Sequence, residues 1–510
     1  MGYVSTPRQT VKASRLHIIE SNRKSAKING NYSVPNAEFS AIMEKRRFRM
    51  SIMAAFMVPH PPMIVPEVGR GSEKQIEKTI RAYEKVAEEI AALKPETIII
   101  SSPHSVMYSD YFHISPGSGA FGSFAEFGAP QVQFDVAYDE ELVNRLADKA
   151  EASHFPAGTL GQKRKELDHG TMVPLWFILK KYRDFKLVRT GLSGHDLLKH
   201  YEYGMLIKDA VEELGRKAVY VASGDLSHKL QEYGPYGFAE EGPMYDRRIM
   251  DVCSGARFGE LFDFDENFCE KAAECGHKSF VIMAGALDGK AVEAVQYSHE
   301  DVTGVGYGIC SFMPKGEDAG RHFLDARLTL VENDLEQKRQ KSDACVKLAR
   351  ASAEYFVKNG DIMPLPDWVP DELLNTTAGA FVSVHKFGAL RGCIGTIAST
   401  QENLALEIIY NAVSAVSKDP RFEPVAETEL KYLDINVDVL GAAEPIKSEA
   451  ELDVKKYGVI VQSGYKRGLL LPDLDGVNTV EQQVSIARRK GGIAPGDKVD
   501  LFRFEVVRHY

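Results

Sequence analysis

Short apolar runs alternate with amphipathic segments over residues 53–312, and this alternation predicts an α/β fold. The runs are nearly continuous in hydrophobic residues, as is typical of strands buried on both faces of a parallel sheet. The predicted strands are 53–58, 97–101, 186–190, 218–222, 291–297 and 305–312, and the predicted helices are 72–93, 173–182 and 196–214. We therefore expect an N-terminal α/β domain with a mostly parallel sheet over residues 53–314.

The pattern changes after residue 314. A stretch rich in Pro, Gly and charge predicts a linker, which we place at 315–335. A charged helix over 328–358 follows and ends at a typical stop signal, Asn359-Gly360. Short strands and one helix then complete an α+β pattern, so residues 336–510 form a separate C-terminal domain. The strands are expected at 381–385, 390–395, 433–440, 458–462 and 469–471, and the helix at 402–416.

Composition is that of a globular protein with two or three domains: 510 residues, 44% hydrophobic and 26% charged. No stretch is apolar enough to predict a membrane span. Residues 1–50 hold ten Lys or Arg and three acids, a local net charge of +7. Because the whole chain has a net charge of -10, the remaining residues carry -17. So acidic a body argues against nucleic-acid binding. The basic leader, 1–52, is predicted to be disordered, either as a targeting segment or as sequence upstream of a start at Met50 or Met53.

Six cysteines are scattered along the chain without a CxxC pair. This usage is typical of a reducing compartment and predicts a cytoplasmic protein. It argues against a disulfide framework and against a structural zinc site of paired cysteines.

Three histidines follow predicted strands in the same way. His60, His104 and His228 each end a short polar loop directly after an apolar run. In an open α/β sheet, ligands bind at the carboxyl ends of the strands, so these imidazoles can converge on one point. Imidazole nitrogen is the commonest transition-metal donor, and the pattern predicts a metal site as readily as three unrelated histidines.

Five short motifs are spread along the N-terminal domain. They are Val58-Pro-His-Pro-Pro62, Ser101-Ser-Pro-His104, Leu167-Asp-His-Gly170 with Val173-Pro-Leu-Trp176, Ser223-Gly-Asp-Leu-Ser-His228, and Glu274 through Leu287. By these motifs, which run in the family's order, residues 53–312 resemble the class III extradiol ring-cleavage dioxygenase family, in its LigB-like and Memo-like branch.

The resemblance implies an Fe(II) enzyme that opens a catechol-type aromatic ring with O2. It places the metal ligands at His60, His104 and Glu274, and an acid/base histidine at His228. It also places a substrate-contacting histidine at His169. Two imidazoles and a carboxylate would leave Fe(II) an open face for substrate, although Zn or Mn suits the same donors. Asp225, three residues before His228, could orient an imidazole.

Memo-like proteins share the fold without all being ring-cleaving enzymes. Cys275, next to Glu274, leaves two interpretations open: a thiol that joins the metal pocket, or a small buried apolar residue. The alternative function is therefore a metal-binding module without ring cleavage. Gly117–Gly122 is expected to be a flexible loop, one that could cover the pocket.

The C-terminal domain has motifs of its own: Leu390-Arg-Gly-Cys-Ile-Gly-Thr396, Asp419-Pro-Arg-Phe422 and Gly468-Leu-Leu-Leu-Pro472. By these motifs, residues 336–510 resemble a second family, the AMMECR-type domain. The resemblance implies a radical SAM protein as partner in a modification pathway. Arg391 and Cys393 could bind an anion or supply a nucleophile, or they could simply belong to a tight hairpin that needs Gly392 and Gly395. Oligomeric state is left open.

Overall fold

The computed structural model describes residues 51–474 and 476–510. Nearly all of the predicted basic leader lies outside these residues. The chain divides into two compact units with the boundary between Ala326 and Arg327. None of the described helices is both long enough and apolar enough to span a membrane.

The N-terminal unit is built on a six-stranded sheet in the order β7-β2-β8-β1-β10-β9. The first four strands are parallel, and β10 and β9 add an antiparallel edge. Every residue of β2 and β8 is buried, as expected for central strands covered on both faces. The strands are β1 Ile52–Val58, β2 Thr97–Ser101, β7 Lys186–Thr190, β8 Ala218–Ser223, β9 Lys290–Glu300 and β10 Tyr307–Glu317. This confirms the predicted fold class.

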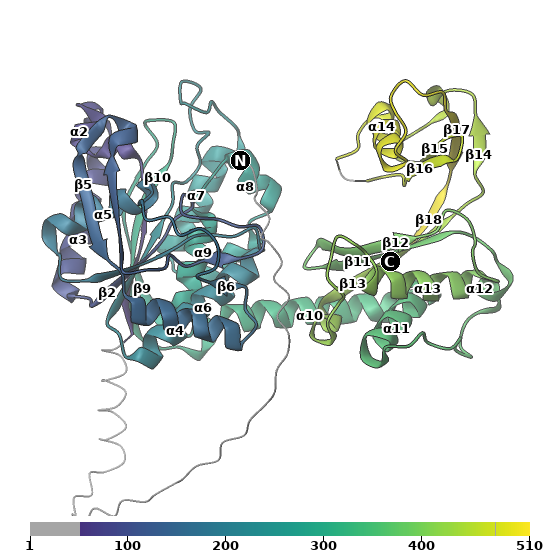
Figure 1. Ribbon diagram of the computed structural model, residues 1–510, viewed down its shortest axis with the longest axis horizontal. Helices are drawn as coiled ribbons and strands as arrows, with labels where there is room; N and C mark the ends of the chain where they lie inside the picture. Colours follow the sequence, from purple (N-terminus) through teal and green to yellow (C-terminus); the bar gives the residue numbers. More distant parts are fainter. Residues whose placement is uncertain (1–50, 475) are drawn as a thin grey trace, which may run out of the picture. The chain divides into compact units, whose positions relative to one another are not determined.

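Helices cover both faces of this sheet. Figure 1 shows α3 and α5 on one face and α6, α7 and α9 on the other. The side chains of α3 and α5 form one continuous core with alternate residues of β1, β2 and β8. The larger helices are α3 Glu77–Leu93, α4 Glu140–Ala152, α5 His169–Lys181, α6 Leu197–Leu214, α7 Glu241–Ser254, α8 Glu266–Ala272 and α9 His277–Ala286.

The segment expected to be a flexible glycine-rich loop is largely a strand. β4 (Gly119–Phe124) pairs with β5 (Ala129–Ala137) in an antiparallel hairpin beside α5. An added Cβ at Gly122 would lie 2.9 Å from the Cβ of Leu167, so this glycine permits close packing rather than flexibility. The short strands β3 Phe112–His113 and β6 Ala157–Gly158 pair nearby.

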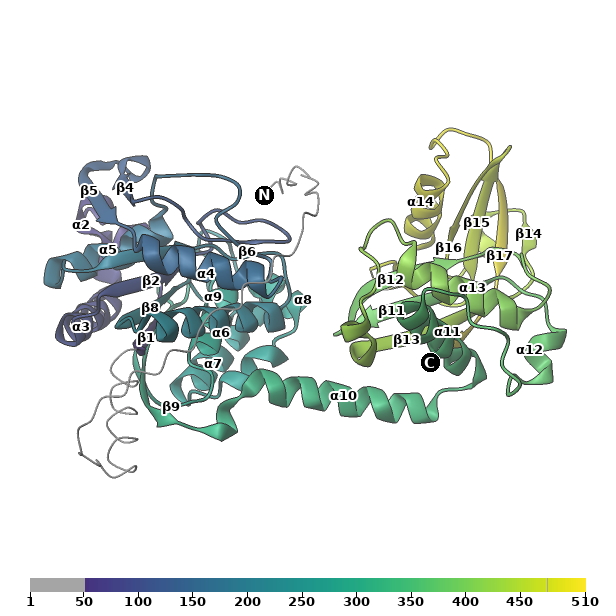
Figure 2. The ribbon, with the colours of Figure 1, turned by 60° about the horizontal axis from the view of Figure 1, so that its bottom comes forward.

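The C-terminal unit contains two antiparallel four-stranded sheets, β12-β11-β13-β18 and β14-β17-β15-β16. Helices α11 and α13 share a core with the first sheet, and α14 packs on the second (Figure 2). The elements are α11 Ala344–Asn359, α12 Asp371–Asn375, β11 Ala380–Lys386, β12 Ala389–Gly395, α13 Leu404–Ser417, β13 Leu433–Leu440, β14 Glu444–Ile446, β15 Gly458–Ser463, β16 Lys466–Leu470, α14 Val480–Lys490, β17 Asp500–Phe504 and β18 Val506–His509.

The predicted linker and the charged helix after it differ from the structure. Residues 315–335 are the end of β10, a short 3-10 turn and most of helix α10 (Phe323–Lys341). A new helix, α11, starts after Asp343, whose side chain accepts the backbone N–H of Val346 at 3.1 Å. This N-cap separates two helices that the charge pattern merged, because periodicity alone does not detect a cap.

Helices α6 and α9 cross at two glycines, Gly204 of α6 and Gly285 of α9, where the facing backbone leaves no room for a side chain. A Cβ added at Gly204 would overlap the backbone oxygen of Ile282. We expect Gly204→Ala to lower the free energy of unfolding by about 1–3 kcal/mol, the usual cost of overpacking a core. Gly320→Ala is the control, since its nearest neighbour would be 3.3 Å away. Thermal unfolding of both variants checks this, and equal stability would contradict the close crossing.

Candidate metal centre

The strand order brings the predicted histidines to one edge of the sheet. His60 follows β1, His104 follows β2, and the loop that carries Asp225 and His228 follows β8, which lies between β1 and β2. Because these three strands are parallel neighbours, their carboxyl ends meet.

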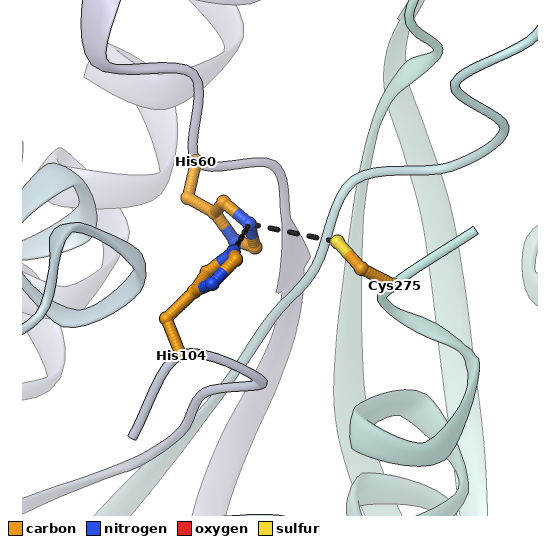
Figure 3. A group of neighbouring side chains, drawn as sticks. All are labelled: His60, His104 and Cys275. Carbon is orange, nitrogen blue, oxygen red and sulfur yellow. Dashed lines mark hydrogen bonds between the residues drawn. The ribbon is translucent and has the colours of Figure 1, made fainter. Parts of the chain in front are cut away.

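Two imidazoles and a thiol face one another at this point (Figure 3). The Nε2 atoms of His60 and His104 are 3.0 Å apart, and Cys275 Sγ lies 3.6 Å from His60 Nε2. All three donor atoms lie within 4.8 Å of one another, which is close enough to surround one ion. His60 is only 2% exposed.

Cys275 reaches the site because two backbone segments touch. It lies in the turn between α8 and α9, and the following Gly276 packs against Gly224, which follows β8. A Cβ on Gly224 would overlap the Cα of Gly276. The thiol thereby comes within 3.3 Å of the backbone N of Asp225. In the sequence, this contact is marked only by two glycines about fifty residues apart. No local motif connects them, so the contact could not be predicted.

Glu274, predicted as the carboxylate ligand, has a different place. Among the described residues it belongs to none of the groups of converging donor atoms. Its Oε2 accepts the backbone N–H of His277 at 2.6 Å, at the start of α9. The first N–H groups of a helix have no partner within the helix, and Glu274 supplies an acceptor for one of them. Burial raises the pKa of this carboxyl to about 7.

The tautomer of His60 is set by Ser223, which begins the motif 223–228 but was given no role from the sequence. The Ser223 hydroxyl donates to the backbone oxygen of Gly170 at 2.6 Å, so its oxygen accepts the Nδ1–H of His60 at 3.0 Å. Neutral His60 therefore carries no proton on Nε2, and that lone pair points toward His104 and Cys275. This is the state in which imidazole binds metal. Ser223, which fixes the orientation of the ring without touching the ion, is a typical outer-sphere partner of a metal-binding histidine.

The other predicted site residues surround this group. Asp225 Oδ1 accepts the backbone N–H of His60 at 2.7 Å, and its Oδ2 lies 4.0 Å from His228 Nε2. Asp225, His228 and Cys275 form a second group of converging donor atoms. The His169 ring lies 4.0 Å from that of His104. The structure thus brings together every predicted residue of this domain's site except Glu274, and adds Cys275.

Burial keeps the imidazoles neutral and the thiol protonated. Loss of hydration lowers the pKa of His60 and His104, and lowers those of His169 and His228 to about 4. Burial, reinforced by nearby carboxylates, raises the pKa of Cys275 well above its usual value. The histidines are therefore ready to bind a cation at neutral pH, whereas the thiol must first lose a proton.

The whole-chain comparisons agree with the motifs. Residues 54–310 match the family described as "Catalytic LigB subunit of aromatic ring-opening dioxygenase", and residues 346–509 match AMMECR1. A protein from Clostridium acetobutylicum is 41% identical over 468 residues, which cover 90% of this chain and 99% of that relative. The chain belongs to the LigB family. Both resemblances inferred from the motifs are confirmed.

Other relatives cover parts of the chain. A protein from Thermotoga maritima is 50% identical over 166 residues, 32% of this chain and 95% of that relative. A solved structure of an uncharacterized Pyrococcus horikoshii protein has 30% identity and a TM-score of 0.30, covering 32% of this chain and 88% of that one. An uncharacterized Escherichia coli K12 structure has 16% identity and a TM-score of 0.36, covering 51% and 99%.

A cavity of about 640 Å³ adjoins the donor group of the LigB domain. His104 and His169 form part of its wall, and the β4–β5 hairpin contributes Phe121 and Phe134. Its volume falls in the range of pockets that take drug-sized ligands and exceeds the need of a single aromatic ring. The hairpin, which was predicted as a covering loop, is thus one wall of the cavity.

In the AMMECR1 domain, Arg391 is held by the protein itself. Its guanidinium pairs with Glu429 at 2.9 Å and donates to the backbone oxygen of Glu423 at 2.9 Å. The Cys393 backbone N–H donates to Asp419 at 2.9 Å, and burial raises the pKa of its thiol. Arg391 is therefore engaged rather than free for an anion, and Cys393 lacks the lowered pKa of a nucleophile. The hairpin interpretation fits these contacts.

Metal binding to the LigB domain is expected to release about one proton per ion at neutral pH. A neutral imidazole can keep its single proton on Nδ1 while Nε2 binds the ion, whereas the Cys275 thiol must lose its proton to solvent. The affinity should then fall by about tenfold for each unit by which pH drops. Competition by protonated His60 and His104 should begin only below the ordinary histidine value of about 6.5, since their pKa values are lowered. Calorimetry in buffers of different ionisation enthalpy counts the proton, and Cys275→Ser should release close to none.

Proposed function

We propose that the LigB domain is a metal-dependent oxidoreductase that holds one transition-metal ion on His60, His104 and Cys275. The observation that carries this proposal is the convergence of three donor atoms: His60 Nε2 lies 3.0 Å from His104 Nε2 and 3.6 Å from Cys275 Sγ. Two imidazoles and a thiolate suit iron, copper or zinc better than a hard cation such as Mn. Iron, expected from the resemblance, stays a prediction, with zinc as the alternative.

The surrounding residues can hold the site's geometry and move protons. When bound, the ion would supply Lewis acidity or a change of oxidation state. Asp225 fixes the His60 backbone, and Ser223 fixes the His60 ring. His228 Nε2 is buried without a hydrogen-bond partner among the described residues, so it can accept a proton from a bound hydroxyl group. His169 borders both His104 and the cavity and can contact a substrate there.

Ring opening of a catechol-type aromatic compound with O2 is the second candidate. It is favoured by the cavity of about 640 Å³, which has aromatic side chains in its wall and reaches His104 and His169. His228 would take the proton of the substrate hydroxyl and later return it. As the alternative, we propose that the same centre binds metal without cleaving rings, and that the protein acts with a radical SAM partner in a modification pathway. The cytoplasmic location stays a prediction.

Oxygen uptake separates ring opening from metal binding without it. The full chain, loaded anaerobically with one equivalent of Fe(II), is mixed with catechol and O2. If the second candidate holds, catechol should drive oxygen consumption, and His228→Ala should slow it by roughly 10²–10⁴-fold with the metal retained. His154→Asn, at an exposed histidine, is the control and should keep full activity. A loaded chain that consumes no oxygen with catechol would remove ring opening and leave the metal centre standing.

A further inference from the structure

Three metal-ligating side chains also meet in the AMMECR1 domain, far from the LigB site in sequence. They are Asp343, Cys345 and His509, and their donor atoms all lie within 4.8 Å of one another. Asp343 is the N-cap of α11, Cys345 is in the first turn of that helix, and His509 ends the edge strand β18. Asp343 Oδ2 pairs with His509 Nδ1.

The Cys345 thiol is what distinguishes this group from an ordinary Asp–His pair. It is 4% exposed, it is free of any disulfide, and among the described residues it has no hydrogen-bond partner. The thiol therefore lies buried and unpartnered beside a carboxylate and an imidazole. Apolar packing accounts for a buried cysteine, but not for its position within ligand distance of two further metal donors.

The backbone fixes all three donors in place. Asp343 uses Oδ1 to cap α11, at 3.1 Å from the backbone N of Val346, while its Oδ2 faces His509. His509 is paired with Val437 in the sheet, and the preceding Arg508 is held by Asp438 at 2.8 Å. A site with pre-positioned ligands loses little conformational entropy when it binds an ion.

The local charge favours a cation. Burial, together with the carboxylates of Asp343 and Glu372, raises the pKa of the Cys345 thiol to about 12. Two negative groups thus act on the thiol, and Glu372 is exposed on α12. A divalent ion would neutralise this charge and take the thiolate as ligand.

We propose that Asp343, Cys345 and His509 form a second metal site, suited to Zn²⁺. Sulfur, imidazole nitrogen and carboxylate oxygen are the donors that zinc binds, and three protein ligands leave a fourth position for water or a mobile carboxylate. Binding forms the Zn–S bond and releases the thiol proton to solvent, without any change of oxidation state. The ion would tie the edge strand β18 to the start of α11, whose backbones are 166 residues apart.

Cobalt(II) is the probe, because it gives a sulfur-to-metal charge-transfer absorption only when a thiolate is bound. The experiment uses the full chain carrying Cys275→Ser, so that the LigB site contributes no thiolate. We expect this chain to show the absorption with Co(II), and Zn²⁺ to displace it. Adding Cys345→Ser should abolish the absorption, whereas adding Cys393→Ser, at a half-buried thiol of the same domain, should leave it unchanged.

Two milder variants guard against loss of folding. Asp343→Asn keeps the helix cap, since Asn caps as well as Asp, but removes the charged ligand. His509→Ala changes a half-buried residue. Each should weaken Co(II) binding by roughly tenfold or more while circular dichroism of the metal-free chain stays native. A Cys275→Ser chain without the thiolate absorption, or one whose absorption survives Cys345→Ser, would overturn the proposal.

Discussion

Cys275→Ser is expected to remove tight metal binding from the LigB domain. Serine preserves the size of the side chain, but its hydroxyl does not ionise near neutral pH, so the ion loses its anionic ligand. Changes to residues that only orient a ligand cost roughly 10–100-fold in affinity, and loss of the ligand itself should cost at least about 100-fold. Competition with a chromophoric chelator measures the metal affinity. The chain used also carries Cys345→Ser, which disables the proposed second site, so that only the LigB site is observed.

Glu274→Gln is the matched comparison, one residue away. A glutamine oxygen can still accept the N–H of His277, the bond that Glu274 makes at 2.6 Å, so α9 should remain intact. In our assignment Glu274 supports the start of α9 and is not a ligand. Metal affinity should therefore stay within about threefold of the unsubstituted chain, a difference of about 0.7 kcal/mol. Loss of metal in Glu274→Gln together with retention in Cys275→Ser would restore the carboxylate as ligand and refute our assignment.

Arg189→Met is expected to have the largest effect on stability. Arg189 is 1% exposed, and its guanidinium donates to the backbone oxygens of Glu166 and Arg164, both at 2.7 Å. It also lies 3.8 Å from the buried Asp168 carboxylate. Breaking such a buried pair leaves an uncompensated charge and costs about 3–5 kcal/mol. The segment 164–168, which leads into His169 and lines the cavity, would lose its anchor.

Chemical unfolding of the full chain tests this expectation, with Arg183→Met as control. Arg183 is exposed, and a surface change of this kind should alter the free energy of unfolding by less than about 0.5 kcal/mol. The transition of the N-terminal unit should shift strongly in Arg189→Met, while that of the AMMECR1 domain should not move. Equal unfolding of the two variants would mean that Arg189 does not hold the 164–168 segment.

The sheet and the histidines of the site could be predicted because the signal is local. Each parallel strand is a short buried run, and a ligand-bearing loop follows it directly, as for His60 after β1 and His104 after β2. Neighbouring parallel strands then bring these loops together without further information. The same reasoning puts Asp225 and His228 at this edge of the sheet, since both follow β8; their roles stay predictions.

The third ligand that we propose could not be chosen in this way, because Glu274 and Cys275 are adjacent and only their orientation differs. The choice depends on the contact of Gly224 with Gly276 and on the need of α9 for an acceptor at its start. Arg391 is a similar case. The sequence left an anion site and a tight hairpin open at Arg391, and it could not show that the carboxylate paired with Arg391, that of Glu429, comes from 38 residues away.

X-ray absorption at the metal edge of the zinc-loaded chain tests the central claim, ligation by His60, His104 and Cys275, most directly. The sample again carries Cys345→Ser, so that Cys275 is the thiol under test. Two imidazoles and a thiolate predict one sulfur scatterer at about 2.3 Å together with nitrogen scatterers at about 2.0–2.1 Å, and Cys275→Ser should remove the sulfur shell. A shell of nitrogen and oxygen alone, unchanged by Cys275→Ser, would show that the thiol is not a ligand and would contradict the account.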